Sequence, residues 1–402
     1  MMEVHYDAIR SALGGMEYAS ELDRRPMGRN RDRIRGSLIG GAAGDALGYA
    51  VEFRSESDIF RQFGERGITE YQLVRGEARI SDDTQMTLFT ANGLLVGTAK
   101  GHPGIAVKSS YVGPVSQAYC EWYLTQTGAS PGNEPRRPTC WLMNVPGLYA
   151  ARAPGNTCMS AIYNGCGGTI ERPITNSKGC GGVMRVAPIG LYFGGRDMAS
   201  LPVDLLGADA AALTHGHGMG YIPAAMMVHI IRLVSGSDEI TLREAVLDSR
   251  SAMQALFPDS PHLPGFLALM DRAVSLSESG GDDLAAIHSL GPGWCGDEAL
   301  AVAVYCALKY ADDFDRAIIA SVNHGGDSDS TGAITGNILG AYLGLSGIPQ
   351  KYIDTLELKD VILEIADDLF EDCRLDEPGG LTEEKRLEWQ SKYVDAVYKG
   401  RG

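Results

Sequence analysis

Gly40-Gly41-Ala42-Ala43-Gly44-Asp45-Ala46-Leu47-Gly48 is the stretch of this chain that decides its fold. It continues a series of small residues that begins at Gly36 and is interspersed with Leu38 and Ile39. Glycine costs a helix about 1 kcal/mol per residue relative to alanine, so small residues at helical spacing make sense where a neighbouring helix packs very closely. The stretch therefore predicts a buried central helix that starts near Ile34.

Apolar residues at helical spacing continue through most of the chain after this stretch. Valine, isoleucine and aromatic residues nowhere alternate over a long segment, as a substantial sheet would require. A glycine- and proline-rich segment from Gly128 to Gly182 is predicted to be irregular, yet ordered by apolar residues such as Trp141 and Leu148. We predict one compact, multi-helix, all-α domain over residues 34–402, preceded by an N-terminal extension over residues 1–33. The predicted helices span residues 83–98, 106–127, 184–195, 204–214, 219–235, 242–256, 297–311, 313–323, 329–343 and 359–371.

The composition argues against several classes of function. A hydrophobic fraction of 44% and a charged fraction of 21% are typical of soluble globular proteins. A formal net charge of −16 argues against nucleic acid as the main partner. We find no apolar segment near the roughly 20 residues that span a bilayer, and no signal peptide. The eight cysteines are scattered without a C-x-x-C pair, which indicates reduced thiols. A cytoplasmic protein is expected, with no membrane partner.

Two acidic clusters far apart in the chain point to a metal site. They are Ser81-Asp82-Asp83-Thr84 and Asp327-Ser328-Asp329-Ser330-Thr331, the second preceded by Gly325-Gly326. Either cluster alone could cap a helix, although the second also resembles a loop that wraps an ion. Together they would offer four carboxylates that repel one another unless they are protonated or bind cations. Their hard oxygen donors favour magnesium, manganese or calcium, and the pairing implies one such ion or two.

A third informative segment is Ser177-Lys178-Gly179-Cys180-Gly181-Gly182-Val183-Met184-Arg185. Glycines before a helix start can present backbone N–H groups to an anion, although a tight turn between helices explains them equally well. The spacing fits neither a P-loop nor a dinucleotide fingerprint. Beside the acidic clusters, a phosphate-bearing ligand becomes the better interpretation. His215 and His217 could bind zinc together, but no cysteine or third histidine lies at the spacing of a zinc site. A loop histidine that packs or forms a hydrogen bond is the commoner case.

These motifs, in this order, resemble the ADP-ribosylglycohydrolase family, which includes the dinitrogenase-reductase-activating glycohydrolases. The resemblance covers about residues 34–370 and includes Arg152 to Cys158 and Gly293-Trp294. It implies an all-α fold with two magnesium ions in a central cleft, manganese being the alternative metal. The ligands implied by motif position are Ser81, Asp82, Asp83, Asp327, Asp329 and Ser330. The residues implied to line an ADP-ribose pocket are Ser177, Gly179, Gly181, Gly182 and His215. Glu52 matches a glutamate that gates the cleft or assists catalysis in some members.

The implied chemistry fits these side chains. Hydrolysis at the anomeric carbon of a ribose passes through an oxocarbenium-like state, in which cations position hydroxyl groups and a carboxylate takes a proton from water. Asp83, Asp327 and Glu52 are the candidates for that carboxylate, and the residues do not choose among them. We predict a magnesium-dependent hydrolase that removes ADP-ribose from a modified protein side chain, arginine being preferred over serine.

The N-terminal extension offers an alternative function of another class. Some members of the family are immunity proteins, and residues 1–33 could bind an ADP-ribosyltransferase toxin directly in addition to hydrolysis. The simpler interpretation is a terminus that is disordered or packs on the domain as a helix.

Overall fold

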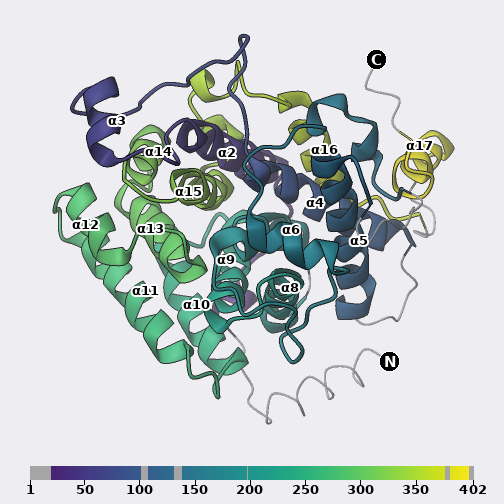
Figure 1. Cartoon of the computed structure of the whole chain (residues 1–402). Helices are drawn as coiled ribbons and strands as arrows, with labels where there is room; N and C mark the ends of the chain where they lie inside the picture. Colours follow the sequence, from purple (N-terminus) through teal and green to yellow (C-terminus); the bar gives the residue numbers. More distant parts are fainter. Residues whose placement is uncertain (1–19, 101–106, 131–137, 197, 376–380, 398–402) are drawn as a thin grey trace.

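The computed structural model describes residues 20–100, 107–130, 138–196, 198–375 and 381–397. In this part of the chain the structure consists of α-helices, short 3₁₀ turns and three isolated β-bridges, without a sheet (Figure 1). The all-α prediction is therefore confirmed. The helices are α2 (Arg31–Tyr49), α3 (Glu56–Phe63), α4 (Asp82–Lys100), α5 (Val107–Thr127), α6 (Asn156–Tyr163), α7 (Ala187–Phe193), α8 (Ser200–Ala212), α9 (Gly218–Gly236), α10 (Leu242–Leu256), α11 (Leu263–Glu278), α12 (Asp283–Leu290), α13 (Gly296–Lys309), α14 (Phe314–Val322), α15 (Ser328–Leu343), α16 (Lys359–Glu371) and α17 (Glu383–Tyr393).

Helices α2 and α15 pack against each other through glycine, at the centre of the molecule (Figure 1). A Cβ atom added at Gly40 would lie 2.4 Å from the carbonyl oxygen of Gly336, which is a clash with backbone. The close approach recurs every fourth residue in opposite directions, so the helices are antiparallel: Gly36 faces Gly340, Gly40 faces Gly336, and Gly44 faces Gly332. The predicted close packing is confirmed. As a consequence, the end of α2 meets the beginning of α15.

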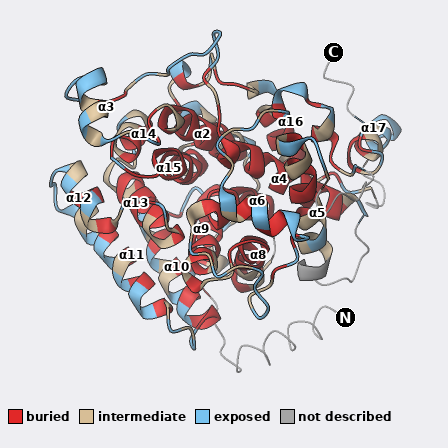
Figure 2. Cartoon of the chain, in the orientation of Figure 1, coloured by how far each residue is buried: buried red, intermediate tan, exposed pale blue. Residues whose placement is uncertain are grey.

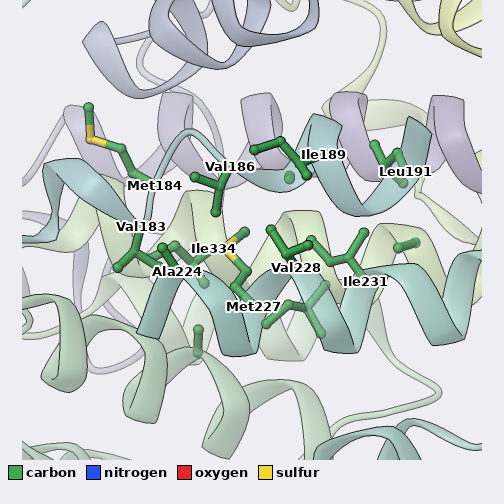
Figure 3. Close-up of a cluster of buried hydrophobic side chains, with 14 of the residues drawn as sticks. Val183, Met184, Val186, Ile189, Leu191, Ala224, Met227, Val228, Ile231 and Ile334 are labelled. Atoms are coloured by element: carbon green, nitrogen blue, oxygen red, sulfur yellow. The ribbon is translucent and has the colours of Figure 1, made fainter. Parts of the chain in front are cut away.

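The apolar core continues between α7 and α9. Val186 and Ile189 face Val228 and Ile231 of α9, and α15 contributes Ile334 (Figure 3). Figure 2 shows that α2, α8, α9 and α15 are almost entirely buried, whereas α11 and α12 keep an exposed outer face. By length and composition alone α9 could cross a membrane, contrary to the expectation from sequence. Because 89% of its apolar window is buried inside the protein, α9 is a core helix here.

Every predicted helix is present, and the described ranges contain five further helices that were not predicted. Helices α3, α6 and α12 have eight residues each, too few for a clear apolar period. Helix α11 begins with Leu263-Pro264-Gly265, a sequence that is typical of a turn, although proline is well tolerated in a first helical turn. Helix α17 is largely charged. The segment from Gly128 to Gly182 is thus less irregular than expected, since it contains α6.

The described part of the N-terminal extension packs on the domain. The hydroxyl of Ser20 donates to Asp248 (2.7 Å), Asp23 pairs with Arg232 (2.6 Å), and α2 begins at Arg31, before the predicted boundary at residue 34. Residues 1–19, which include most of the apolar side chains that a partner would contact, lie outside the described residues. The toxin-binding role of the extension therefore stays a prediction.

Candidate active site

The two acidic clusters line one cavity. Asp82 and Asp83 lie in the first turn of α4, whereas Asp327 caps α15 and Asp329 lies in its first turn. These four side chains, together with Glu52, line a cavity of about 190 Å³, and each of the five residues is at most 8% exposed. Both helices start at this cavity, so their N-terminal dipoles partly favour the negative charges. The structure therefore brings together the carboxylates that the sequence pattern singled out.

Ser81 and Ser330, the two serines implied as metal ligands, are also buried. The hydroxyl oxygen of Ser81 accepts a hydrogen bond from the backbone N–H of Asp83 (3.2 Å). The hydroxyl of Ser330 lies 3.5 Å from the sulfur of Cys180, to which it donates. Ser330 lines the cavity, whereas Ser81 lies behind its wall. A hydrogen bond from Ser81 also lowers the pKa of Asp329, against the larger effect of burial, so the two clusters are in direct contact.

Asp45 of α2 fixes the position of the first cluster. Its carboxylate is fully buried and accepts hydrogen bonds from the backbone N–H groups of Ser81 (2.9 Å) and Thr84 (3.1 Å), and from the Thr84 hydroxyl. Asp45 therefore caps the beginning of α4 from another helix. The sequence pattern alone assigned Asp45 no role. The available signal was a carboxylate within a stretch predicted to be buried, because such a group needs partners.

The carboxyl groups of the cavity all have raised pKa values, because they are buried and lie close to one another. Burial, and next the charge of Asp329, raise the pKa of Glu52 to about 10 and that of Asp45 to about 7. The same two causes raise the pKa values of Asp82 and Asp83 well above their usual range, and Asp327 behaves likewise. Within the described chain, no basic side chain forms an ion pair with these groups. The site thus lacks a counter-charge of its own.

The donor set fits a hard divalent cation. Glu52, Asp327 and Asp329 each offer an oxygen, and these oxygens lie within 4.8 Å of one another. Two buried oxygens, Oε2 of Glu52 and Oδ2 of Asp83, have no hydrogen-bond partner in the described structure. Buried carboxylate oxygens normally have partners, and magnesium or manganese prefers such ligands. Glu52, expected as a catalytic candidate, thus lies among the potential metal ligands.

The glycine-rich loop forms another part of the cavity wall. Gly179 and Gly181 line it, as expected, but Ser177 and Gly182 do not. Ser177 instead accepts a hydrogen bond from the N–H of Gly179 (3.2 Å), and Gly182 packs closely against the backbone of α9. The N–H of Cys180 is also used, by the carbonyl oxygen of Trp294 (3.1 Å). Two of the N–H groups proposed to bind an anion are therefore already occupied within the protein.

His215 faces the cavity as a neutral imidazole. Burial, and next the Arg185 guanidinium, lower the pKa of His215 to about 3. Its Nδ1 lies 2.8 Å from the hydroxyl of Thr214, which already accepts a hydrogen bond from Arg185 (2.7 Å). That hydroxyl can donate its own proton to Nδ1, which leaves the ring proton on Nε2. A Cβ atom at Gly181 would lie 3.3 Å from Nε2, so this nitrogen points toward the loop that lines the cavity. It can serve as a hydrogen-bond donor there.

Cys180 joins the two walls and was not predicted as a site residue. Its thiol donates to Oδ2 of Asp327 at 2.7 Å, and it lines the cavity. Asp82 is held from another side, since it accepts a hydrogen bond from the N–H of Gly155 (3.3 Å). A neutral thiol among glycines carries little signal in a sequence. Only the approach of the loop to α15 reveals its contact with a carboxylate.

Comparisons with known proteins point to one family. A family model described as ADP-ribosylglycohydrolase matches residues 27–379. The chain is 27% identical to ADP-ribosyl-[dinitrogen reductase] glycohydrolase of Rhodospirillum rubrum over 335 residues, which cover 82% of this chain and 91% of that protein. It is 25% identical to ADP-ribosylarginine hydrolase Tri1 of Serratia proteamaculans over 350 residues, which cover 86% of this chain and 81% of the relative.

Solved structures share the fold, and one of them is described as an ADP-ribosylglycohydrolase-related protein complex. It matches with a TM-score of 0.50 and 22% sequence identity. The match covers 85% of this chain and 98% of the other. At this identity the likeness supports the all-α architecture alone.

Proposed function

Because this chain belongs to the ADP-ribosylglycohydrolase family, we propose that it hydrolyses the glycosidic bond between ADP-ribose and a modified protein side chain. One observation carries the proposal: the two acidic clusters and the glycine-rich loop with His215 line the same cavity. The carboxylates supply groups for chemistry at an anomeric carbon, and the loop supplies a wall for the phosphate-bearing part of the ligand.

Two magnesium ions are the proposed cofactor, with manganese as the alternative. The residues that would hold them are Asp82, Asp83, Asp327 and Asp329, with the hydroxyls of Ser81 and Ser330. Bound cations of this kind polarise ribose oxygens and lower the pKa of water. The unmatched negative charge of the cavity and the partnerless oxygen of Asp83 support this assignment.

The hydrogen bonds of the three candidate carboxylates narrow the choice of the residue that accepts the proton from water. Asp327 accepts from the Cys180 thiol and, at 3.4 Å, shares the N–H of Ser330 with Asp329, so each of its oxygens has a partner. Glu52 and Asp83 each keep one oxygen without a partner. A general base must keep an oxygen that is bound neither to a cation nor to a hydrogen-bond donor, and Glu52, which is not among the proposed magnesium ligands, meets this condition better than Asp83 or Asp327. The neutral His215 is proposed to donate a hydrogen bond from Nε2 to the diphosphate or to a ribose hydroxyl.

Arginine is the proposed linkage. A relative whose alignment covers most of both chains is described as an ADP-ribosylarginine hydrolase, and this description supports an arginine linkage over a serine linkage. The test is to incubate the protein with carriers of arginine-linked and serine-linked ADP-ribose, with magnesium and with a chelator. We expect magnesium-dependent release of ADP-ribose from the arginine carrier. Release that persists in chelator would contradict the role of the cation, and release from serine alone would contradict the linkage.

A further inference from the structure

Two exposed aromatic rings lie beside the cavity. Phe53, the residue after Glu52, is 74% exposed, and Trp294, which lines the cavity, is 42% exposed. Their rings are stacked, with centroids 6.3 Å apart and planes 20° apart. Large aromatic groups normally contribute to stability by burial, so an exposed pair at a cavity suggests a ligand that covers it.

Both rings are held in place by ordered backbone. The carbonyl oxygen of Trp294 accepts from the N–H of Cys180 (3.1 Å), and the N–H of Gly296 donates to the carbonyl oxygen of Lys178 (2.8 Å). Phe53 follows the buried residues Val51 and Glu52 in a turn closed by a hydrogen bond from Arg54 to Val51 (2.9 Å). The exposure of the rings is therefore a property of fixed turns.

The position of the rings relates them to the leaving group. If the loop with Gly181 and His215 binds the phosphate-bearing part, the bond that breaks lies near the carboxylates. Phe53 is adjacent in sequence to Glu52, and a Cβ atom at Gly293, just before Trp294, would lie 3.4 Å from Cβ of Asp327. The side chain that leaves ADP-ribose must pass close to these carboxylates, and hence to the two rings.

We propose that Phe53 and Trp294 form an aromatic clamp that holds the modified side chain and selects a planar cation, the guanidinium of arginine, over a neutral hydroxyl-linked group. The proposal rests on the proposed function and adds the residues that determine its linkage. Guanidinium groups stack on aromatic faces and are attracted by their π electrons. The negative carboxylates nearby favour the same cation. A serine linkage offers neither a charge nor a plane.

The test compares kcat/KM for arginine-linked and serine-linked ADP-ribose in the parent protein and in four variants. Phe53→Leu and Trp294→Leu keep apolar area but remove the π face, whereas Phe53→Tyr keeps it. Tyr163→Leu is the matched control, because Tyr163 on α6 is 49% exposed but does not line the cavity. We expect the arginine-to-serine ratio to fall about tenfold in each of the first two variants. It should stay near that of the parent protein in Phe53→Tyr and Tyr163→Leu.

Two results would overturn the clamp, and they are distinguishable. If the parent protein hydrolyses the arginine carrier but the ratio is unchanged in both leucine variants, the clamp is wrong and the proposed function stands. If the parent protein hydrolyses neither carrier, the proposed function fails and the clamp with it. The magnesium-induced rise in melting temperature, measured on every variant, shows that the cavity remains folded.

Discussion

Two groups of buried carboxylates in this protein are built in opposite ways. Asp204 of α8 and Asp248 of α10 flank His229 of α9, at 2.7 Å and 2.9 Å from its two ring nitrogens. Burial lowers the pKa of His229, but the charges of these carboxylates and their hydrogen bonds outweigh it and raise the value to about 9. The group therefore carries its own counter-charge. In the cavity, Asp329 and its neighbours have none within the described chain.

The difference distinguishes carboxylates that stabilise the fold from carboxylates that are arranged to bind a ligand. A paired group ties three helices together and needs nothing from outside the chain. The cavity group has negative charges that raise one another's pKa values, an arrangement that costs stability unless a cation or protons bind. Buried charge is therefore informative only together with its partners. The following predictions either break this contrast or sharpen it.

The largest expected effect is that of Asp329→Asn. The charge of Asp329 is the leading charge effect on the pKa values of Glu52, Asp82, Asp83 and Asp327. Removing it should reduce hydrolysis by about a thousandfold or more, as expected for loss of a group that balances charge in the transition state. Because repulsion also falls, the metal-free protein should melt at a higher temperature. A variant with the turnover and metal content of the parent protein would refute the paired-cluster interpretation.

The paired group should respond in the opposite way. His229→Leu removes the cation that lies between Asp204 and Asp248, and breaking a buried ion pair typically lowers the free energy of unfolding by about 3–5 kcal/mol. Hydrolysis per folded molecule should be unchanged, because His229 does not line the cavity. Urea denaturation with a parallel activity assay measures both quantities. A stable but inactive variant would show that the two groups are coupled.

The parts of this contrast that sequence could predict follow from local patterns. The glycine spacing from Gly36 to Gly48 predicted a tightly packed helix, and the two acidic clusters predicted a shared site. The pattern could not show that α15 is the packing partner, since spacing reports how close a neighbour lies and not which one it is. Gly332 and Gly336, which complete the contact, lie in an otherwise ordinary apolar helix.

Residues whose role depends on crossing elements were missed. Asp45 caps α4 only because α2 crosses it, and Cys180 meets Asp327 only because the loop approaches α15. The pairing of His229 with carboxylates on two other helices was likewise invisible in the sequence. Local spacing predicts helices and clusters of like residues, whereas contacts between unlike residues need the tertiary structure.

Titration with and without magnesium should distinguish the two groups. Folding raises the pKa of Glu52 from 4.5 to about 10, so the folded state binds its proton more tightly than the unfolded state. Without cations, this group favours folding at pH below 4.5, and the effect is lost as the pH rises toward 10. His229 has the same sign, and its contribution declines between pH 6.5 and about 9.

Magnesium should restore only the first of these losses. A cation at a hundred times its Kd stabilises the folded state by about 2.7 kcal/mol, and its advantage should grow with pH as protons leave the cavity. Melting temperatures of the parent protein and His229→Leu, measured from pH 5 to 9, check this. An identical magnesium shift at all pH values would mean that cation and protons do not compete for the same carboxylates.

The smallest effect is expected for substitutions of Cys180, which gives a cavity carboxylate a hydrogen bond but no counter-charge. Its thiol is a neutral donor that partly supports one of the unpaired carboxylates, Asp327, without supplying charge. Groups that orient a metal ligand typically contribute 10- to 100-fold, so Cys180→Ala should lower kcat by about tenfold. Cys180→Ser keeps a hydroxyl donor and should lose less than the alanine variant. Equal loss in both variants would indicate that the size of the sulfur atom matters, and no loss in either would show that Asp327 needs no support beyond the N–H of Ser330.

Metal affinity measured alongside kcat separates a weakened ligand from a misplaced substrate, because only the former should change the concentration of magnesium that gives half-maximal activity.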